Sequence, residues 1–376
     1  LSLKSPAAPP QQLAVFRDGD EMTTIDNATD AGSLAYMGYM TSALPYEVHA
    51  TARSALILNS ATGGQILQAH HYGMSAIDAV EPDEQLSRLI SEQYSDYFGW
   101  PTLEARVTMI DISARGHASS GKRYDIVVMG PPGTSTGGSA GVHTMMASYD
   151  YTVEALQSYL KLLNPDGLLS LTLWTSSPAR DNLNLFKTAV TAMKDSGMKD
   201  PGNNIAWLRS WNTATLMIKN TALTDDDIGS IRAFSRSNNF DLAWLPGITA
   251  NETNRYQLLQ QDVFYKAAAM LATDHEADST AFIDNYKYDI QPATDNRPFF
   301  YNHFKWSSVP EFLALPGSTG LSMIGVGYPT LLVTLLQATL ASIILILLPL
   351  LFIRAAEKRS TDSVNKRASA DDIVTS

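Results

Sequence analysis

Apolar positions along this chain recur with two different periods, and a long unbroken apolar run lies near the C-terminus. Short apolar stretches, which are typical of buried strands, occur at residues 55–58, 76–80, 105–111, 123–130, 167–174 and 213–220. Apolar residues at helical spacing occur between them, at residues 65–72, 83–98, 153–163, 183–197 and 224–238. Strands that alternate with helices in this way predict an α/β fold with a parallel, doubly wound sheet.

Polar residues mark where several of these elements begin and end. Asp83 is expected to cap the helix that follows it. Thr224 is expected to cap a helix whose first turn holds three aspartates, an arrangement that the helix dipole favours. The sequence Asn-Pro-Asp-Gly at 164–167 is a turn signal between a helix and the next strand.

Composition divides the chain into segments. We expect a flexible Pro- and Ala-rich lead-in (1–12), a β-hairpin region (13–50), the α/β domain (51–306), a linker (307–329), an apolar helix (330–353) and a basic, then polar tail (354–376). The predicted fold is therefore a doubly wound sheet with an N-terminal β appendage and a C-terminal transmembrane helix.

The apolar run at 330–353 is long enough to cross a hydrocarbon core of ~30 Å. A buried core helix is the alternative, but such helices are usually shorter and polar on one face. No Lys or Arg lies in the ~20 residues before the run, the stretch that the positive-inside rule weighs. We therefore expect a cytoplasmic tail and a large extracytoplasmic, periplasmic domain. Five basic residues follow the run: Arg354, Lys358, Arg359, Lys366 and Arg367.

Charge and cysteine content exclude several classes of function. The net charge is −11 and the body of the chain has no basic stripe, so a nucleic-acid partner is not expected. The chain has no cysteine, which excludes disulfides, thiolate metal sites and a cysteine nucleophile. His70 and His71 are neighbours on a helix and face different ways, so no metal site is expected there.

The first strand and the turn after it have the layout of a nucleotide-type cofactor site. Residues 55–58 lead into a turn at 59–64, where backbone N–H groups can approach a cofactor closely. Glu81 ends the next strand, where an acid accepts hydrogen bonds from ribose hydroxyls. A plain βα turn with a surface glutamate explains the spacing equally well.

A set of longer segments in a fixed order resembles one known group. These segments are ALILNSATGGQ…AIDAVEPD, RYDIVVMG, ASYDYTVEALQSYLKLLNPDGLLSLTLW, TLMIKNTALTDDDIGSIRAFSRSNNFDLAWLPG and PATDNRPFFYNHFKW. The chain resembles the bacterial membrane-associated spermidine-synthase-like proteins, relatives of the polyamine aminopropyltransferases built on the class I methyltransferase fold. The resemblance covers residues 14 to 353, and TVEALQSYL and TDNRPFF are its most specific parts.

The resemblance implies a cofactor site with a degenerate glycine turn. The family has a run of glycines followed by an acid. Here Gly63 matches, Gln65 stands in place of the acid, and Glu81 matches the acid that binds ribose. The resemblance thus implies S-adenosylmethionine or its decarboxylated form as a cofactor, or none if the turn no longer binds. Three other residues stand where glycines are expected: Asn59, Ala61 and Thr62.

The resemblance also implies an adenine motif and a pair of catalytic acids. Asp111 lies two residues before the usual place of the adenine acid, Ser113 occupies that place, and Arg115 is retained. True aminopropyltransferases carry two acids after the fourth strand, which hold and deprotonate the attacking amine. Gly130 and Gly133 stand there instead, so no catalytic residue is assigned.

Two functions from different classes remain. The first is a non-catalytic subunit or scaffold of a membrane assembly, with other membrane-protein subunits and the bilayer as partners. The second is a membrane-bound transferase that uses S-adenosylmethionine or its decarboxylated form on a polyamine or related amine, since methyl transfer can rely on positioning alone. The small-residue loop at 134–144 could act as a lid. Four aromatic residues could stack on a substrate, pack the domain edge or meet the bilayer: Phe299, Phe300, Tyr301 and Phe304.

Overall fold

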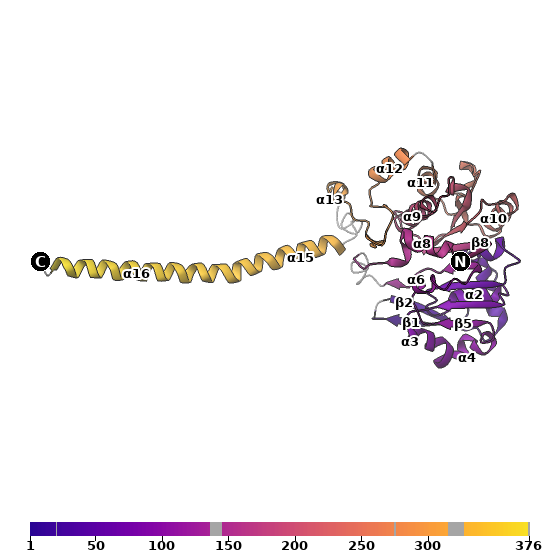
Figure 1. The fold of residues 1–376 in the computed structure, drawn as a ribbon, viewed down its shortest axis with the longest axis horizontal. Coiled ribbons are helices and arrows are strands. Elements are labelled where there is room, and N and C mark those ends of the chain that lie inside the picture. The colour runs from indigo at the N-terminus through magenta and orange to yellow at the C-terminus, as the bar shows by residue number, and fades with distance from the viewer. Residues whose placement is uncertain (20, 136–144, 274–275, 315–326, 375–376) are drawn as a thin grey trace.

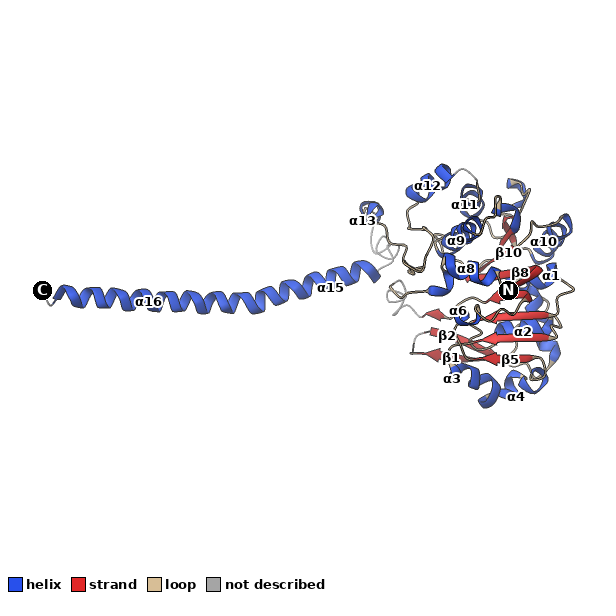
Figure 2. Cartoon of the chain, viewed as in Figure 1, coloured by secondary structure: helices blue, strands red, loops and turns tan. Residues whose placement is uncertain are grey.

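A mostly parallel sheet forms the centre of the domain (Figures 1 and 2). The structure is a computed structural model that describes residues 1–19, 21–135, 145–273, 276–314 and 327–374. In these residues eight strands follow the order β11-β9-β10-β8-β6-β3-β4-β5. Their bounds are β3 Ser54–Leu58, β4 Ala76–Val80, β5 Val107–Ile110, β6 Tyr124–Met129, β8 Leu163–Trp174, β9 Ile205–Arg209, β10 Thr213–Lys219 and β11 Asp241–Trp244.

The sheet has the strand order of the class I methyltransferase fold. Strands β5, β4, β3, β6 and β8 are parallel, and β10 lies antiparallel between β8 and β9. The sheet is parallel through these five strands, as predicted, and its pairs are antiparallel at the end formed by β10, β9 and β11. Only a tight turn separates β9 from β10, and such a short connection makes two strands antiparallel. Strands β9 and β11 were not predicted.

The helices cover both faces of the sheet. Leu56 and Leu58 of β3 face a core formed with α8 and α9, whereas Ala55 and Ile57 face a core formed with α2. Side chains therefore alternate between two buried faces, which makes the strand apolar throughout. The helices of the domain are α1 Leu44–Val48, α2 Gly64–His71, α3 Glu84–Arg88, α4 Ser95–Phe98, α5 Trp100–Leu103, α6 Ala114–His117, α8 Val153–Leu160, α9 Asp181–Asp195, α10 Asp225–Asn238, α11 Val263–Leu271, α12 Glu276–Asn285 and α13 Val309–Leu313.

The predicted caps are present, but one helix is broken and one turn is absent. Asp83 accepts a hydrogen bond from the Gln85 N–H, and Thr224 forms a capping box. The segment 83–98 comprises α3, a π-helical turn and α4 rather than one helix. Residues 164–167 lie within β8, where the register against β6 shifts.

The N-terminal region is a hairpin followed by helical turns. Strands β1 (Gln12–Arg17) and β2 (Glu21–Asp26) pair with each other, and β2 also pairs with β7 (Thr134–Ser135). Between the hairpin and α1, however, the chain forms the 3-10 helices η1 (Ala31–Tyr39) and η2 (Thr41–Ala43) rather than strands. The expected flexible lead-in is also partly docked, because the Ser2 hydroxyl donates to the Asn238 carbonyl at 2.6 Å.

One C-terminal helix is long and apolar enough to cross a membrane. It comprises α15 (Gly327–Ser342), a π-helical turn (Ile343–Leu347) and α16 (Leu348–Val374). The stretch Pro329–Thr361 has a mean hydropathy of 2.6 in its most apolar window, and none of that window is buried. Figure 1 shows this helix projecting away from the domain, so its apolar side chains pack on nothing in the described chain.

Candidate functional site

The carboxyl ends of β3, β4, β5 and β6 meet at one edge of the sheet, which we call the carboxyl edge. Parallel pairing of these strands brings the turn after β3, Glu81 after β4, Asp111 after β5 and Gly130 after β6 to this edge. Ligands of open α/β sheets bind at such an edge. The sequence-predicted site residues that follow these strands therefore lie at one edge of the sheet.

Three residues of the turn after β3 have a left-handed backbone, and only one of them is a glycine, the residue that favours it. Asn59, Ala61 and Gly63 have φ of 51°, 47° and 86°. A left-handed conformation costs a residue with a Cβ atom roughly 1–2 kcal/mol. Other contacts must therefore hold Ala61 in place.

Glu81 supplies one of those contacts. The Ala61 N–H donates to Glu81 Oε2 at 2.7 Å, and the Asp83 N–H donates to Glu81 Oε1 at 3.1 Å. Glu81 is only 3% exposed. Burial raises the pKa of its carboxyl group, and the two backbone hydrogen bonds partly counter that rise. Both carboxylate oxygens thus bind the chain's own backbone, at the position expected to bind a ribose.

Gly63 makes room for a side chain of the same protein. A Cβ atom at Gly63 would overlap the ring of Phe98 and lie 3.1 Å from Ile90 Cδ1. Phe98 is fully buried at the end of α4. Packing against Phe98 therefore explains the glycine here without a cofactor.

The N-terminal hairpin covers the same turn. The buried Thr62 hydroxyl donates to the Thr24 carbonyl of β2 at 2.7 Å. In the first half of β2, Met22 pairs with Thr134 of β7. The hairpin thus links the turn after β3 to the segment after β6.

Neighbouring side chains occupy the space beside the two glycines after β6. A Cβ atom at Gly130 would lie 2.8 Å from Gln65 Cγ, and one at Gly133 would lie 2.5 Å from Glu21 Cγ. The Trp174 indole N–H donates to the Pro132 carbonyl between them at 2.7 Å. An acid at either glycine would displace one of these residues. The loop 134–144, predicted as a lid, lies outside the described residues after Ser135.

Arg115 binds the segment that leads toward the apolar helix. Its guanidinium donates to both carboxylate oxygens of Asp295 at 2.9 Å, and to the Thr152 hydroxyl at 3.1 Å. The hydrogen bonds from Arg115 lower the pKa of Asp295. Ser113, at the usual place of the adenine acid, caps α6 by accepting from the Gly116 N–H. Asp111 is exposed.

The two most specific segments of the resemblance contact each other. The Thr152 hydroxyl donates to Asp295 at 2.7 Å, and the Asp295 N–H donates to Glu154 at 2.9 Å. Phe300 is fully buried and its ring stacks on Tyr151 at 4.7 Å between centroids. Phe300 thus packs the domain edge, as one of the interpretations of the aromatic segment predicted.

Asp150 and Asp125 are polar residues with structural partners. The Asn59 amide donates to Asp150 at 2.9 Å, a contact that sequence reasoning missed because the two residues belong to distant elements. Burial alone would raise the pKa of Asp125, but hydrogen bonds from the Arg53 N–H, Asn164 and Ser54 lower it to about 2. Asp125 therefore links β6 to the start of β3.

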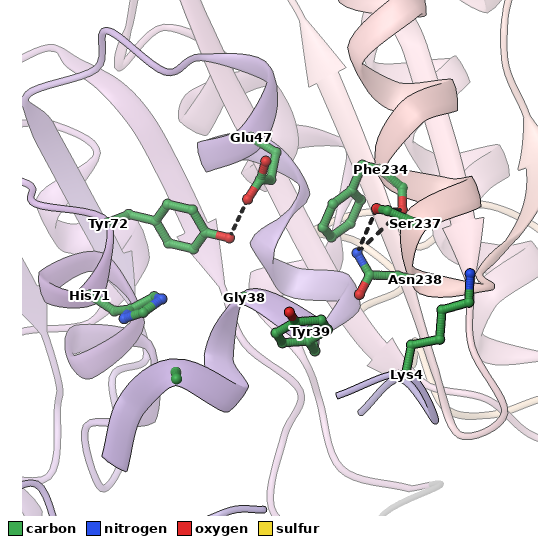
Figure 3. Close-up of a pocket in the computed structure, with 10 residues that line it drawn as sticks. Lys4, Gly38, Tyr39, Glu47, His71, Tyr72, Phe234, Ser237 and Asn238 are labelled. Carbon is green, nitrogen blue, oxygen red and sulfur yellow. Dashed lines mark hydrogen bonds between the residues drawn. The ribbon is translucent and has the colours of Figure 1, made fainter. Parts of the chain in front are cut away.

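A cavity of about 460 Å³ lies elsewhere in the domain, and Figure 3 shows residues that line it. It opens where the end of α2 faces η1, α1 and α10, and the Tyr72 hydroxyl donates to Glu47 at 2.7 Å on one wall. Neither Gly63 nor Glu81 lines it. His71 does, and burial lowers the pKa of its imidazole. No group of three or more His, Cys, Asp or Glu in the described ranges could hold a metal ion.

Comparisons with known proteins find similarity only among solved structures. No protein-family model matches the chain, and no curated protein matches it. A spermidine synthase in complex with the transition-state analogue AdoDATO is 15% identical, with a TM-score of 0.43 over 68% of this chain and 79% of that one. Spermidine synthase from Thermotoga maritima gives the same identity and TM-score over 68% and 80%. Human methyltransferase-like protein 13 in complex with SAH is 17% identical, with a TM-score of 0.35 over 60% and 98%.

These neighbours are spermidine synthases and methyltransferases. The assignment of the class I methyltransferase fold rests on this chain's own strand order, with β10 antiparallel between β8 and β9.

Proposed function

We propose that this chain is a membrane-tethered, spermidine-synthase-like protein that has lost catalysis and serves as a subunit or scaffold of a membrane assembly. One observation carries the proposal: the chain's own groups occupy the contacts that a cofactor would need. The Glu81 carboxylate binds the N–H groups of Ala61 and Asp83, and the ring of Phe98 fills the space beside Gly63.

The residues at the carboxyl edge do not fit S-adenosylmethionine or its decarboxylated form. A ribose at Glu81 would have to replace two backbone hydrogen bonds to a buried carboxylate. Leaving the Ala61 and Asp83 N–H groups without partners would cost about 1–3 kcal/mol each. A backbone approach at Gly63 would have to displace a buried phenylalanine.

Among the described residues, the two positions after β6 where the catalytic acids are expected also lack the base that aminopropyl transfer needs. Alkyl amines titrate near ~10.4, so an attacking amine is protonated at neutral pH and must lose a proton first. Gly130 and Gly133 supply no acid, and the space beside them holds Gln65 and Glu21. Glu21 forms an ion pair with Arg17, which keeps it engaged within the hairpin.

The proposed scaffold role rests on the membrane-spanning helix as well as on the missing catalytic and cofactor-binding groups. The helix at 330–353 would hold the domain at a bilayer, with the basic tail in the cytoplasm and the domain outside. A domain on that side has no access to a cytosolic cofactor. Other membrane-protein subunits are the proposed partners.

Calorimetry of the full chain in detergent, with S-adenosylmethionine and then with its decarboxylated form, tests the proposal. We expect no heat of binding from protein whose circular dichroism shows a folded α/β domain. The matched control is Glu81→Gln, which keeps the side chain's size and should leave the trace unchanged. If the unmodified protein binds and Glu81→Gln abolishes binding, the proposal fails and the transferase function is correct.

A further inference from the structure

Six large hydrophobic side chains protrude near the carboxyl edge of the sheet. Trp211 is 80% exposed and Trp306 is 64% exposed, which is unusual for the largest apolar side chain. Single exposed hydrophobic residues need no explanation, but several at one edge do. We call this set the rim; it consists of Phe16, Ile112, Tyr149, Trp211, Phe299 and Trp306.

Strand topology places the first rim residues. Ile112 directly follows β5, and Tyr149 lies in the connection from β6 to α8. Phe16 lies near the end of β1, in the hairpin whose β2 pairs with β7 beyond the end of β6. All three therefore lie where strands of the parallel sheet end.

Trp211 occupies the turn between β9 and β10. The Thr175 N–H donates to the Asn212 carbonyl at 2.8 Å, and the Thr175 hydroxyl donates to the Trp211 carbonyl at 2.9 Å. Thr175 directly follows β8, so these bonds fix the turn at the carboxyl end of that strand. The Trp211 side chain is thus exposed from a rigid turn.

Phe299 and Trp306 belong to the segment that leads to the apolar helix. The Ser148 N–H donates to the Pro298 carbonyl at 2.6 Å, which holds Phe299 beside the connection after β6. The His303 ring binds the Asp181 carboxylate at the start of α9, in the region that follows the carboxyl end of β8. The Lys305 ammonium donates to the Ile283, Asp284 and Tyr286 carbonyls, so the chain stays fixed to the domain as far as Trp306.

Helix α13, which precedes the connection to the apolar helix, lies on the same side of the domain as the hairpin that carries Phe16. Helix α13 and the hairpin β1–β2 both lie on the left side of the domain in Figure 1. Leu313, the last residue of α13, and Gly327, the first of α15, are fourteen residues apart. The connection can therefore span at most ~50 Å, because an extended chain gains ~3.5 Å per residue.

We infer that the rim docks on the surface of the bilayer in which the chain's own helix is anchored, with Trp211 and Trp306 in the interfacial layer. Tryptophan favours this layer because its ring is apolar and its N–H group is polar. A bilayer is the occupant that fits best, because the helix proposed to be anchored in it is joined to the domain by a connection of at most ~50 Å. The inference rests on the proposed membrane anchoring.

Labelling with a fluorophore tests this docking, because the chain has no cysteine of its own. Single cysteines are introduced into the full chain beside the two tryptophans, as Asn212→Cys and Ser307→Cys. Ala105→Cys and Ser119→Cys are exposed controls just before β5 and before β6, at the opposite edge of the sheet. Leu340→Cys reports on insertion of the helix itself.

Each labelled protein is reconstituted into phosphatidylcholine vesicles with and without a lipid that carries a quencher at the headgroup. We expect the quencher to dim the labels at 212 and 307 but not those at 105 and 119. Replacing both tryptophans, Trp211→Ser with Trp306→Ser, should abolish the quenching at 212. Equal quenching at both edges, or quenching that survives this replacement, would overturn the docking.

The label at 340, tested with a quencher on the acyl chain, separates two kinds of failure. If it is quenched while those at 212 and 307 are not, the anchor is inserted but the rim faces something other than lipid, so only the docking is wrong. If the label at 340 is not quenched, the membrane anchoring under the proposed function is wrong too.

Discussion

Arg115 and Asp295 form a bidentate ion pair, with both N–O distances at 2.9 Å, that joins the α/β domain to the segment leading to the apolar helix. The Thr152 hydroxyl, which caps α8, donates to the same carboxylate. Arg115 is the residue that the resemblance placed near an adenine. In this chain its guanidinium binds the segment that leads to the apolar helix.

Asp295→Asn should loosen that segment. Both side chains of the pair are about a third exposed, so solvent screening limits the loss of stability to about 1 kcal/mol. Hydrogen–deuterium exchange should show faster exchange over residues 291–304. Asp284→Asn, an exposed aspartate in α12, is the matched control and should change nothing. Equal exchange in the two variants would mean that the ion pair does not hold the segment.

The pH dependence of the same contact has a definite sign. The pKa of Asp295 is lowered by its hydrogen bonds from Arg115. A carboxyl with a lowered pKa in the folded state stabilises the fold above its unfolded pKa of ~3.9 and loses that contribution as the pH falls further. Protection of residues 291–304 should therefore fall on acidification below that pH, and Asp295→Asn should show less of this fall.

Gly63→Ala should destabilise the domain because Phe98 fills the space beside Gly63. The left-handed φ of 86° adds roughly 1–2 kcal/mol to the cost of the overlap. Gly64→Ala is the matched control: a Cβ atom there meets nothing within 4 Å, so it should be neutral or slightly stabilising. Urea unfolding measures both.

A double-mutant cycle identifies the cause. Phe98→Ala alone should cost about 3–5 kcal/mol, the range for truncating a buried phenylalanine. In that background Gly63→Ala should cost less than it does alone, because the overlap is gone. Strictly additive costs would show that Phe98 is not what the glycine accommodates.

Glu81→Ala should destabilise the turn after β3 rather than weaken a ligand. Two backbone N–H groups lose a charged acceptor, a loss of about 1.5–3 kcal/mol for a hydrogen bond to a charged group. Burial raises the pKa of the Glu81 carboxyl in the folded state above its unfolded value of ~4.3. The unfolded chain therefore loses this proton at a lower pH than the folded chain does, and the stability of the fold decreases as the pH rises above ~4.3. Glu81→Gln should remove this part of the slope in urea titrations, whereas exposed Glu84→Gln should not.

Restoring acids after β6 should not create an aminopropyltransferase. Gly130→Asp would press on Gln65 and Gly133→Asp would press on Glu21, so the double variant should have a lower melting temperature than the unmodified chain. Neither protein should form spermidine from putrescine and decarboxylated S-adenosylmethionine. Adding Gln65→Ala should recover part of the melting temperature without activity. Turnover by the unmodified chain would refute this prediction.

Deleting residues 328–376 should release the domain from membranes. The deletion removes the helix that is apolar and long enough to span a bilayer. A chain shortened only by residues 362–376 keeps that helix and should stay in the membrane pellet after an alkaline wash. Retention of the longer deletion in the pellet would mean that another part of the chain holds the membrane.

The sequence by itself determined those features that depend on neighbours along the chain. The alternation of Ala55 and Ile57 with Leu56 and Leu58 follows from the two-residue period of a strand between two cores. The Thr224 cap joins residues three positions apart, so local pattern sufficed. The apolar run at 330–353 is likewise a local property, because spanning length depends only on consecutive residues.

Only the tertiary structure decided what the candidate site residues do. Gly63 and Glu81 were found from motif spacing, yet their partners depend on packing: Phe98 comes from a helix that the sequence predicted as one continuous piece. Arg115 and Asp295 are 180 residues apart, and no local pattern relates them. A motif specifies the position of a residue on the backbone, whereas the rest of the fold determines which groups surround its side chain. In this chain those groups are its own.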